Sequence, residues 1–214
     1  IESKSLNETR EVWVSLPVSY NKTNKKYPVL YVLDAFSHFT ITSQLVTHLA
    51  RSERIPETIV VGLPLIESDD LVRDRIRDYS PTHVAPEPGL NEGRYWQLSG
   101  QAHIFRQFIL DEVMPLINNT YRTEQLNILA GHSQGGLFTT DTLLKGGNEF
   151  QGYIAASPSF WWDDQIMVSK ISEWIQESEL PASYYFSVAS GDKPDAQHPI
   201  NKVHDFRLGN LTNS

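Results

Sequence analysis

Short apolar runs recur along the chain. Nearly every position of residues 27–33 and 58–63 is apolar, which is typical of strands covered on both faces of a parallel sheet. Residues 152–156 and 184–189 are predicted to form two further strands. Residues 11–16 instead alternate polar and apolar side chains, which predicts a half-exposed antiparallel strand near the edge of the sheet.

Between these runs, apolar residues recur with helical spacing. In residues 101–117, for example, Ile104, Phe108 and Val113 fall on one face of a helix. The same spacing predicts helices over residues 38–50, 134–144, 164–177 and 198–211. Because strands and helices alternate from residue 27 onward, the sequence predicts an α/β fold with a mostly parallel sheet, in one domain over residues 1–214.

Residues 67–98 differ from the rest, because they lack a regular period and are rich in proline, glycine and charged residues. We expect a long loop, and loops of this length are often binding elements. Open α/β sheets bind ligands in crevices at the carboxyl ends of their strands. We therefore expect this segment to fold over those ends.

Composition narrows the classes of function. Of the 214 residues, 40% are hydrophobic and 21% are charged, as in ordinary globular proteins. The formal net charge of −8 argues against binding to nucleic acid or to an anionic membrane surface. There is no cysteine, which excludes disulfides, thiolate nucleophiles and zinc–thiolate sites. No apolar run approaches the roughly 20 residues of a membrane span. The compartment and the oligomeric state stay open.

The strongest chemical motif is Gly-X-Ser-X-Gly, centred on Ser133 within the sequence LNILAGHSQGG of residues 126–136. It joins an apolar, strand-like run to a predicted helix, which is the pattern of a nucleophile elbow. A strand that turns abruptly into a helix crowds its own backbone, and only small residues relieve that crowding. The backbone N–H of Gln134, at the start of the helix, can face a developing oxyanion. Ser133 is therefore a candidate acyl-transfer nucleophile.

A serine nucleophile needs a base, and the base needs an orienting carboxylate. In α/β-hydrolases these follow the serine in the order acid, then histidine. The loop after the last predicted strand contains Asp192 and Asp195, and either is a candidate acid. His198 and His204 follow, but they fall in or near the last predicted helix, where surface or packing roles are expected. We therefore expect the base on residues beyond Ser214, so that the chain lacks the last strand and the histidine loop of the domain.

The other five histidines do not fit this order, because they all precede the elbow serine. His132 is its neighbour, and we expect the His132 side chain to point away from the serine in a structural role. His38 and His83 are candidates for lining a pocket. His48 and His103 have no assigned role.

Four stretches together resemble one family. They read YPVLYVLDAFSHF from residue 27, RIRDYSPT from residue 75, GHSQGG from residue 131 and SPSFWWD from residue 157. These motifs are similar to those of the putative-esterase (esterase D-like) branch of the α/β-hydrolases, and most of all to its IroE-like, enterobactin-esterase-like members. The resemblance implies an α/β-hydrolase fold and a serine carboxylic-ester hydrolase that uses neither a metal nor an organic cofactor.

The resemblance also implies roles by position. Ser133 would be the nucleophile and the N–H of Gln134 one oxyanion donor. The second donor would be the backbone N–H of Phe36 or of Ala35, the residue at which the family usually has glycine. Arg75 would be presented toward the serine and bind a carbonyl or carboxylate of the substrate, with a surface salt bridge as the alternative.

Trp161 and Trp162 would form an aromatic wall beside the serine, with core packing as the alternative. The histidine near the C-terminus of the family's domain has no counterpart in this chain. The implied substrate is a small-molecule ester, of the siderophore type or another. Acyltransferase or thioesterase chemistry through the same acyl-enzyme is an alternative, and so is a non-catalytic binding module that lacks its base.

Overall fold

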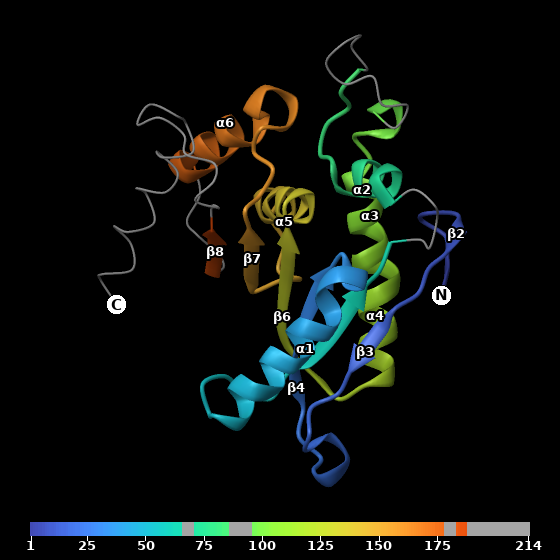
Figure 1. Cartoon of the computed structure of the whole chain (residues 1–214), viewed down its shortest axis with the longest axis vertical. Helices are drawn as coiled ribbons and strands as arrows, with labels where there is room; N and C mark the ends of the chain where they lie inside the picture. Colours follow the sequence, from blue (N-terminus) through green and yellow to red (C-terminus); the bar gives the residue numbers. More distant parts are fainter. Residues whose placement is uncertain (66–70, 86–95, 178–182, 188–214) are drawn as a thin grey trace.

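The central element of the structure is a six-stranded sheet (Figure 1). The computed structural model describes residues 1–65, 71–85, 96–177 and 183–187. The strands follow the order β3-β5-β4-β6-β7-β8, and every neighbouring pair is parallel except β3 with β5. They are β3 Trp13–Ser15, β4 Tyr27–Leu33, β5 Ile59–Leu63, β6 Thr123–His132, β7 Gly152–Ala156 and β8 Ser183–Ser187. The predicted α/β fold with a mostly parallel sheet is confirmed.

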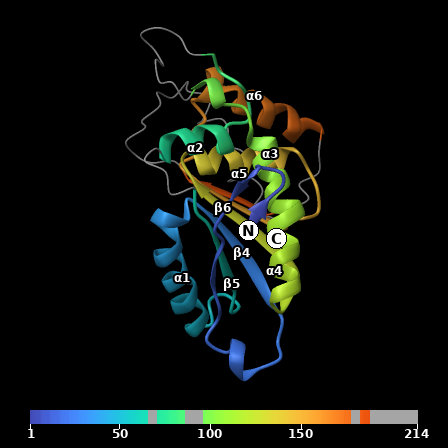
Figure 2. The same cartoon turned by 90° about the vertical axis from the view of Figure 1, so that its right-hand side faces the viewer.

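Helices cover both faces of this sheet (Figure 2). Helix α1 lies on one face, and the run formed by α3, the π-helical turn η3 and α4 lies on the other. The helical elements are η1 Tyr20–Lys22, α1 Ala35–Arg51, α2 Leu71–Tyr79, η2 Trp96–Leu98, α3 Ala102–Phe108, η3 Ile109–Val113, α4 Met114–Thr120, α5 Gln134–Leu144 and α6 Trp162–Glu177. A short hairpin, β1 Glu2–Ser3 and β2 Glu8–Thr9, precedes the sheet.

The alternation of side chains along β4 separates two layers of core. Tyr31 and Leu33 are buried in one cluster with aromatic residues of α3 and α5. Leu30 and Val32 pack in a second cluster with Val46 of α1. Because alternate side chains of a strand point to opposite faces, a strand that is apolar throughout lies between two layers of helices. β4 therefore occupies the middle of the sheet, between β5 and β6.

The expected long loop over residues 67–98 is wrong in part, because α2 occupies Leu71–Tyr79. Asp74 and Asp78 of this helix are fully buried, together with Ile76 and Tyr79. Both acids form ion pairs with arginines. The buried face of α2 is therefore partly charged, which hides its helical period from a reading based on hydrophobicity.

The other predicted elements occur close to their predicted positions. The helix predicted over residues 101–117 is the run from α3 to α4, in which Ile109–Val113 forms a π-helical turn. The helix predicted over residues 198–211 lies outside the described residues. In the part of the chain that the structure describes, no helix is both long enough and apolar enough to cross a membrane.

Candidate active site

The predicted elbow is a sharp turn between β6 and α5. β6 ends at His132, α5 begins at Gln134, and Ser133 between them has φ 55° and ψ −116°. A positive φ is unfavourable for a residue with a Cβ, so the surrounding contacts must hold the turn. The N–H of Ser133 donates to the carbonyl of Ala156 at 2.9 Å, which ties the turn to the end of β7.

Glycine is required where the backbones of this turn approach one another. A Cβ on Gly131 would lie 2.3 Å from the carbonyl oxygen of Gly135. A Cβ on Gly136 would lie 3.0 Å from the Cα of Pro158. The close approach of β6 to the first turn of α5 therefore explains Gly131, and the approach of α5 to the residues that follow β7 explains Gly136.

The hydroxyl of Ser133 has a neighbour that the sequence analysis did not assign, Ser159. The two Oγ atoms are 3.1 Å apart, and the N–H of Ser159 donates to the carbonyl of Ser133 at 3.0 Å. Ser159 is 3% exposed, so its hydroxyl is held close to Ser133 within the protein. The motif SPSFWWD contains Ser159, but its sequence gives no sign of which hydroxyl faces the elbow.

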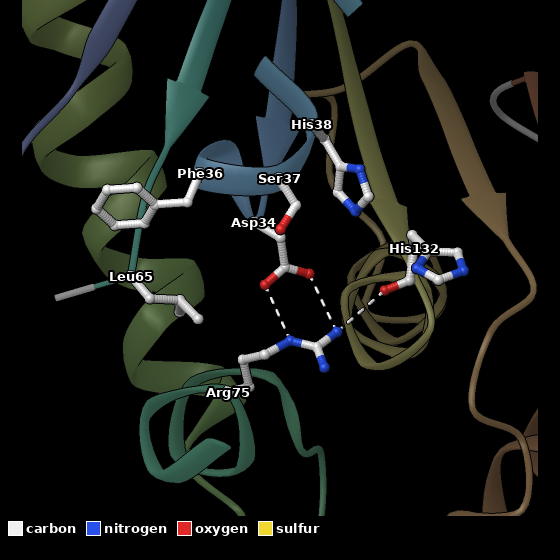
Figure 3. Close-up of a pocket in the computed structure, with 7 residues that line it drawn as sticks. All are labelled: Asp34, Phe36, Ser37, His38, Leu65, Arg75 and His132. Carbon is white, nitrogen blue, oxygen red and sulfur yellow. Dashed lines mark hydrogen bonds and ion pairs between the residues drawn. The ribbon is translucent and has the colours of Figure 1, made fainter. Parts of the chain in front are cut away.

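A second strand-to-helix turn lies beside the first, at the carboxyl end of β4. Asp34 has φ 51° and ψ 47°, and α1 begins immediately after it (Figure 3). The N–H groups of Ser37 and His38 donate to the carbonyl of Asp34 at 2.9 and 3.1 Å. The N–H groups of Ala35 and Phe36, in the first turn of α1, have no intrahelical acceptor.

The two turns lie at the same edge of the sheet because β4 and β6 are adjacent and parallel, with Val32 paired to Ala130. The helices that follow them, α1 and α5, therefore both begin at this edge. First-turn N–H groups and the positive end of the helix dipole favour negative charge. This arrangement can stabilise an oxyanion that forms on a group bound to Ser133.

Arg75 reaches this edge from α2 and is engaged within the protein. Its Nε and Nη2 donate to the two carboxylate oxygens of Asp34 at 2.9 and 3.1 Å, and Nη2 also donates to the carbonyl of His132 at 3.5 Å (Figure 3). The N–H of Asp34 donates to the hydroxyl of Tyr79 at 3.2 Å. Two residues one turn apart on α2 therefore hold Asp34.

A pocket of about 240 Å³ opens between these groups. Figure 3 shows its lining residues, Asp34, Phe36, Ser37, His38, Leu65, Arg75 and His132. The rings of His38 and His132 meet edge to face, with centroids 5.6 Å apart. Burial lowers the pKa of His38; His132 and Arg75 act in the same direction, and Asp34 opposes them. His132 therefore lines the pocket, where a purely structural role was expected.

The two tryptophans occupy different environments. Trp162 is 0% exposed; its ring stacks on Trp96 with centroids 4.7 Å apart, and its Nε1 donates to Thr82 Oγ1 at 3.1 Å. Trp162 is therefore a packing residue and presents no surface to a ligand. Trp161 is 61% exposed and remains a candidate for the aromatic wall.

The structure describes only some of the remaining candidate residues. Asp192, Asp195, His198 and His204 lie outside the described residues. His83 lies beside Ser99, with Nδ1 3.3 Å from its carbonyl oxygen. Among the described residues, no three or more histidine, aspartate or glutamate side chains are grouped so as to hold a metal ion.

The sheet order and the serine elbow together define an α/β-hydrolase. Within that class, the family described as "Putative esterase" matches residues 3–185. The chain belongs to this esterase family.

Relatives of this chain include named esterases. It is 32% identical over 180 residues to the ferri-bacillibactin esterase BesA of Bacillus subtilis, which covers 82% of this chain and 62% of that protein. It is 31% identical over 173 residues to the apo-salmochelin esterase of Escherichia coli, which covers 78% and 53%. The chain thus spans less than two thirds of the length of these curated relatives.

Solved structures agree with this assignment. An IroE-like serine hydrolase from Shewanella oneidensis superposes with a TM-score of 0.82 and 29% identity, over 99% of this chain and 68% of that chain. The BES protein from Bacillus cereus superposes with a TM-score of 0.78 and 26% identity, over 96% and 78%.

Proposed function

We propose that this protein is a serine carboxylic-ester hydrolase that forms an acyl-enzyme on Ser133 and acts on small esters of the siderophore type. The observation that carries the proposal is the convergence of an elbow serine and two helix N-termini at one edge of the sheet. Membership of the esterase family supports the reaction class. The names of the ferri-bacillibactin and apo-salmochelin esterases support the class of substrate.

In the proposed reaction, Ser133 Oγ attacks the ester carbonyl while a base takes its proton. The carbonyl oxygen becomes an oxyanion that accepts hydrogen bonds from the N–H of Gln134 and from the N–H of Phe36 or Ala35. The ester bond then breaks, and the leaving alkoxide takes the proton from the base. Water attacks the acyl-enzyme in the same way, releases the acid and restores the serine.

Substrate binding is assigned to the pocket that Figure 3 shows beside the elbow. Arg75 uses Nε and Nη2 for Asp34, and its Nη1 makes no hydrogen bond to the described residues. We propose that Nη1 binds a carbonyl or carboxylate of the substrate. We also propose that the exposed ring of Trp161 packs against the substrate.

The acid and the base are proposed to lie outside the described residues. Either Asp192 or Asp195 orients the catalytic histidine, which follows the acid in the chain order of α/β-hydrolases. Separate Asn substitutions distinguish the two acids, because only the orienting carboxylate fixes the imidazole tautomer. We expect one variant to lose far more kcat than the other, measured on a short p-nitrophenyl ester. Equal small losses would place the acid elsewhere.

The decisive experiment is Ser133→Ala in the full-length protein. We expect at least about a thousandfold loss of kcat on p-nitrophenyl butyrate with an unchanged melting temperature, because only the nucleophile is removed. A fluorophosphonate probe should label the wild type at Ser133 and leave the variant unlabelled. Turnover near the wild-type rate by Ser133→Ala would refute the assignment. Hydrolysis of a ferric siderophore ester, with the matching amide as control, then tests the substrate class.

A further inference from the structure

The carboxylate of Asp34 does not cap α1, although Asp34 directly precedes that helix. Asp34 precedes the first residue of α1, where an aspartate in the β region of backbone angles commonly caps a helix by accepting the N–H of the second or third residue, but Asp34 itself has φ 51° and ψ 47°. Here the side chain makes no capping hydrogen bond. Both of its oxygens are instead bound by Arg75.

The missing cap matters because a cap would occupy a backbone N–H that the proposed reaction uses. The second residue of α1 is Phe36, whose N–H is a proposed oxyanion donor. A carboxylate bound to that N–H would occupy the donor and place a full negative charge where the reaction develops one. Such a capping contact and a working oxyanion hole exclude each other at this turn.

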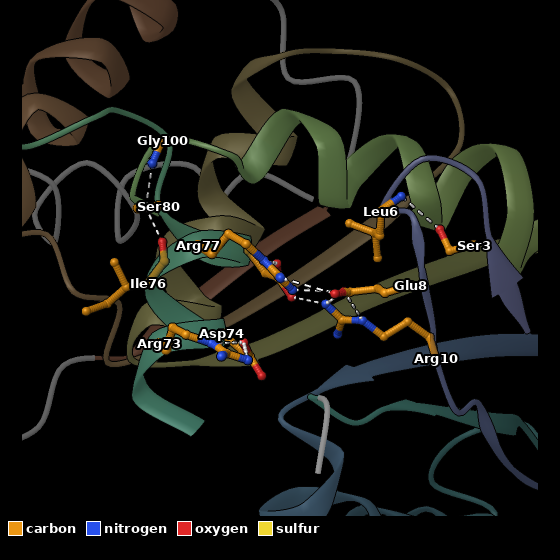
Figure 4. A network of polar contacts seen from close by, with 11 residues as sticks. Ser3, Leu6, Glu8, Arg10, Arg73, Asp74, Ile76, Arg77, Ser80 and Gly100 are labelled. Atoms are coloured by element: carbon orange, nitrogen blue, oxygen red, sulfur yellow. Dashed lines mark hydrogen bonds and ion pairs between the residues drawn. The ribbon is translucent and has the colours of Figure 1, made fainter. Parts of the chain in front are cut away.

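Arg75 is itself held firmly, because α2 is anchored on its other sides (Figure 4). Asp78 accepts from Arg10 at 2.5 Å and from Arg77 at 2.7 Å, and Arg77 also donates to Glu8 at 2.9 Å. At the end of the helix, Ser80 accepts the N–H of Gly100 at 2.9 Å. These contacts tie α2 to the β1–β2 hairpin and to the start of α3.

We propose that Arg75 is a positioning residue that withholds the Asp34 carboxylate from the N-terminus of α1 and so keeps the oxyanion hole open. The two-point contact engages both carboxylate oxygens, and the side chain makes no capping hydrogen bond to α1. The hydroxyl of Tyr79 accepts the N–H of Asp34 and fixes the backbone of the same turn. This inference rests on the proposed function, and it explains why the motif RIRDYSPT accompanies the elbow in this chain.

The inference predicts a rescue that neither a substrate clamp nor a general structural role would produce. Arg75→Gln frees the carboxylate, which then caps α1 and blocks the hole. We expect kcat on the neutral ester p-nitrophenyl butyrate to fall about 100-fold, as when one oxyanion donor is removed, with KM within about twofold. Asp34→Ala in the Arg75→Gln background removes the competing carboxylate and should recover at least about tenfold of that loss.

Two further readouts sharpen the test in the full-length protein. A boronic acid that forms a tetrahedral adduct on Ser133 should lose affinity in Arg75→Gln and regain it in the double variant, in step with kcat. Arg73→Gln is the matched control, because Arg73 lies on the same helix and pairs with Asp74. It should leave kcat unchanged below its melting temperature.

The result that would contradict the role of Arg75 differs from the result that would contradict the proposed function. A double variant as slow as Arg75→Gln, or a loss confined to KM, would overturn the inference. If Arg75→Gln does not fold, Arg75→Lys replaces it, because lysine keeps the charge but cannot make the two-point contact. Asp34→Ala should then relieve the smaller loss in that background. A wild type without turnover or probe labelling would instead refute the proposed function, which is a different result.

Discussion

The two strand-to-helix turns at the site share a positive φ but differ in ψ and in the groups that they present. Asp34 and Ser133 both have a positive φ, both end a central strand, and both precede a helix. At Ser133 the side chain lies beside the hydroxyl of Ser159 and makes no other hydrogen bond to the described residues. At Asp34 the side chain is bound by Arg75, so the groups that this turn presents to a ligand are the N–H groups of the residues that follow Asp34.

The two turns are also held by different forces. The elbow depends on close backbone contact, which glycines at positions 131 and 136 permit. The Asp34 turn depends on an ion pair and on a tyrosine hydroxyl from α2. The elbow, which presents the Ser133 side chain, is thus fixed by backbone contacts. The Asp34 turn, which presents backbone N–H groups, is fixed by the ion pair of the Asp34 side chain and by Tyr79.

The largest effect should come from crowding the elbow. Gly131→Ala places a Cβ 2.3 Å from the carbonyl oxygen of Gly135, where the backbone must move. We expect destabilisation of about 1–3 kcal/mol, measured by urea unfolding, and a loss of most kcat. Gly152→Ala is the control, because the atoms nearest to its Cβ would belong to the side chain of Ile128, at 3.2 Å or more, and not to the backbone. Equal losses of stability and kcat in the two variants would show that the elbow tolerates a Cβ no worse than another buried glycine position does.

A smaller effect is expected at the hydroxyl beside the nucleophile. Ser159→Ala removes the contact that orients Ser133 Oγ and should lower kcat about fivefold to tenfold, the scale of one hydrogen bond. KM should change little. Ser172→Ala, which removes a hydroxyl bonded to Val168 within α6, is the control. Unaltered kcat in Ser159→Ala would mean that the base alone orients the serine.

The Asp34 turn should tolerate a backbone change that the elbow cannot. Ala35→Gly introduces the glycine that the resemblance described above implies at this position, and the ion pair of Asp34 with Arg75 still holds the turn. We expect kcat within about twofold of the wild type and a loss of at most about 1 kcal/mol in stability from backbone entropy. A large loss of kcat would show that the Ala35 methyl group, not the ion pair, fixes the turn.

The smallest effect concerns pH. Burial lowers the pKa of His38, with help from His132 and Arg75 and against Asp34, so the folded state favours the neutral ring. Below the usual value of 6.5 the unfolded state takes up the proton more readily, and stability falls as the pH falls. In His38→Gln the drop in melting temperature between about pH 7 and pH 5 should be shallower. An identical drop would assign the pH dependence to other groups.

The elbow could be predicted from the sequence because all of its requirements are local. The apolar strand, the glycines and the start of α5 are consecutive, and the turn follows from their order. Strands β4 and β7 could also be predicted from the sequence, because an apolar run of this length is rarely compatible with another element. The shared edge of the two turns then follows from the parallel pairing of neighbouring strands.

The Asp34 turn could not be derived in the same way. Arg75 is 41 residues away in the chain, and no pattern of hydrophobic and polar residues pairs it with Asp34. Helix α2 was hidden for a related reason, because Asp74 and Asp78 occupy positions that are usually apolar in a buried helix face. Ser159 is one of four serines from residue 157 to residue 172, and only the three-dimensional structure shows that it faces Ser133.

The ion pairs beneath α2 constrain how this protein can diverge. Arg10 and Asp78 each expose 1% of their side chains, and Arg10 lies 5.6 Å from the ring centre of Phe105. Replacing Arg10 leaves Asp78 paired with Arg77 alone, and replacing Asp78 leaves Arg10 paired with Glu8 alone. Because a buried charge is costly when it loses a partner, substitutions at positions 10 and 78 should occur together in sequences that derive from this one.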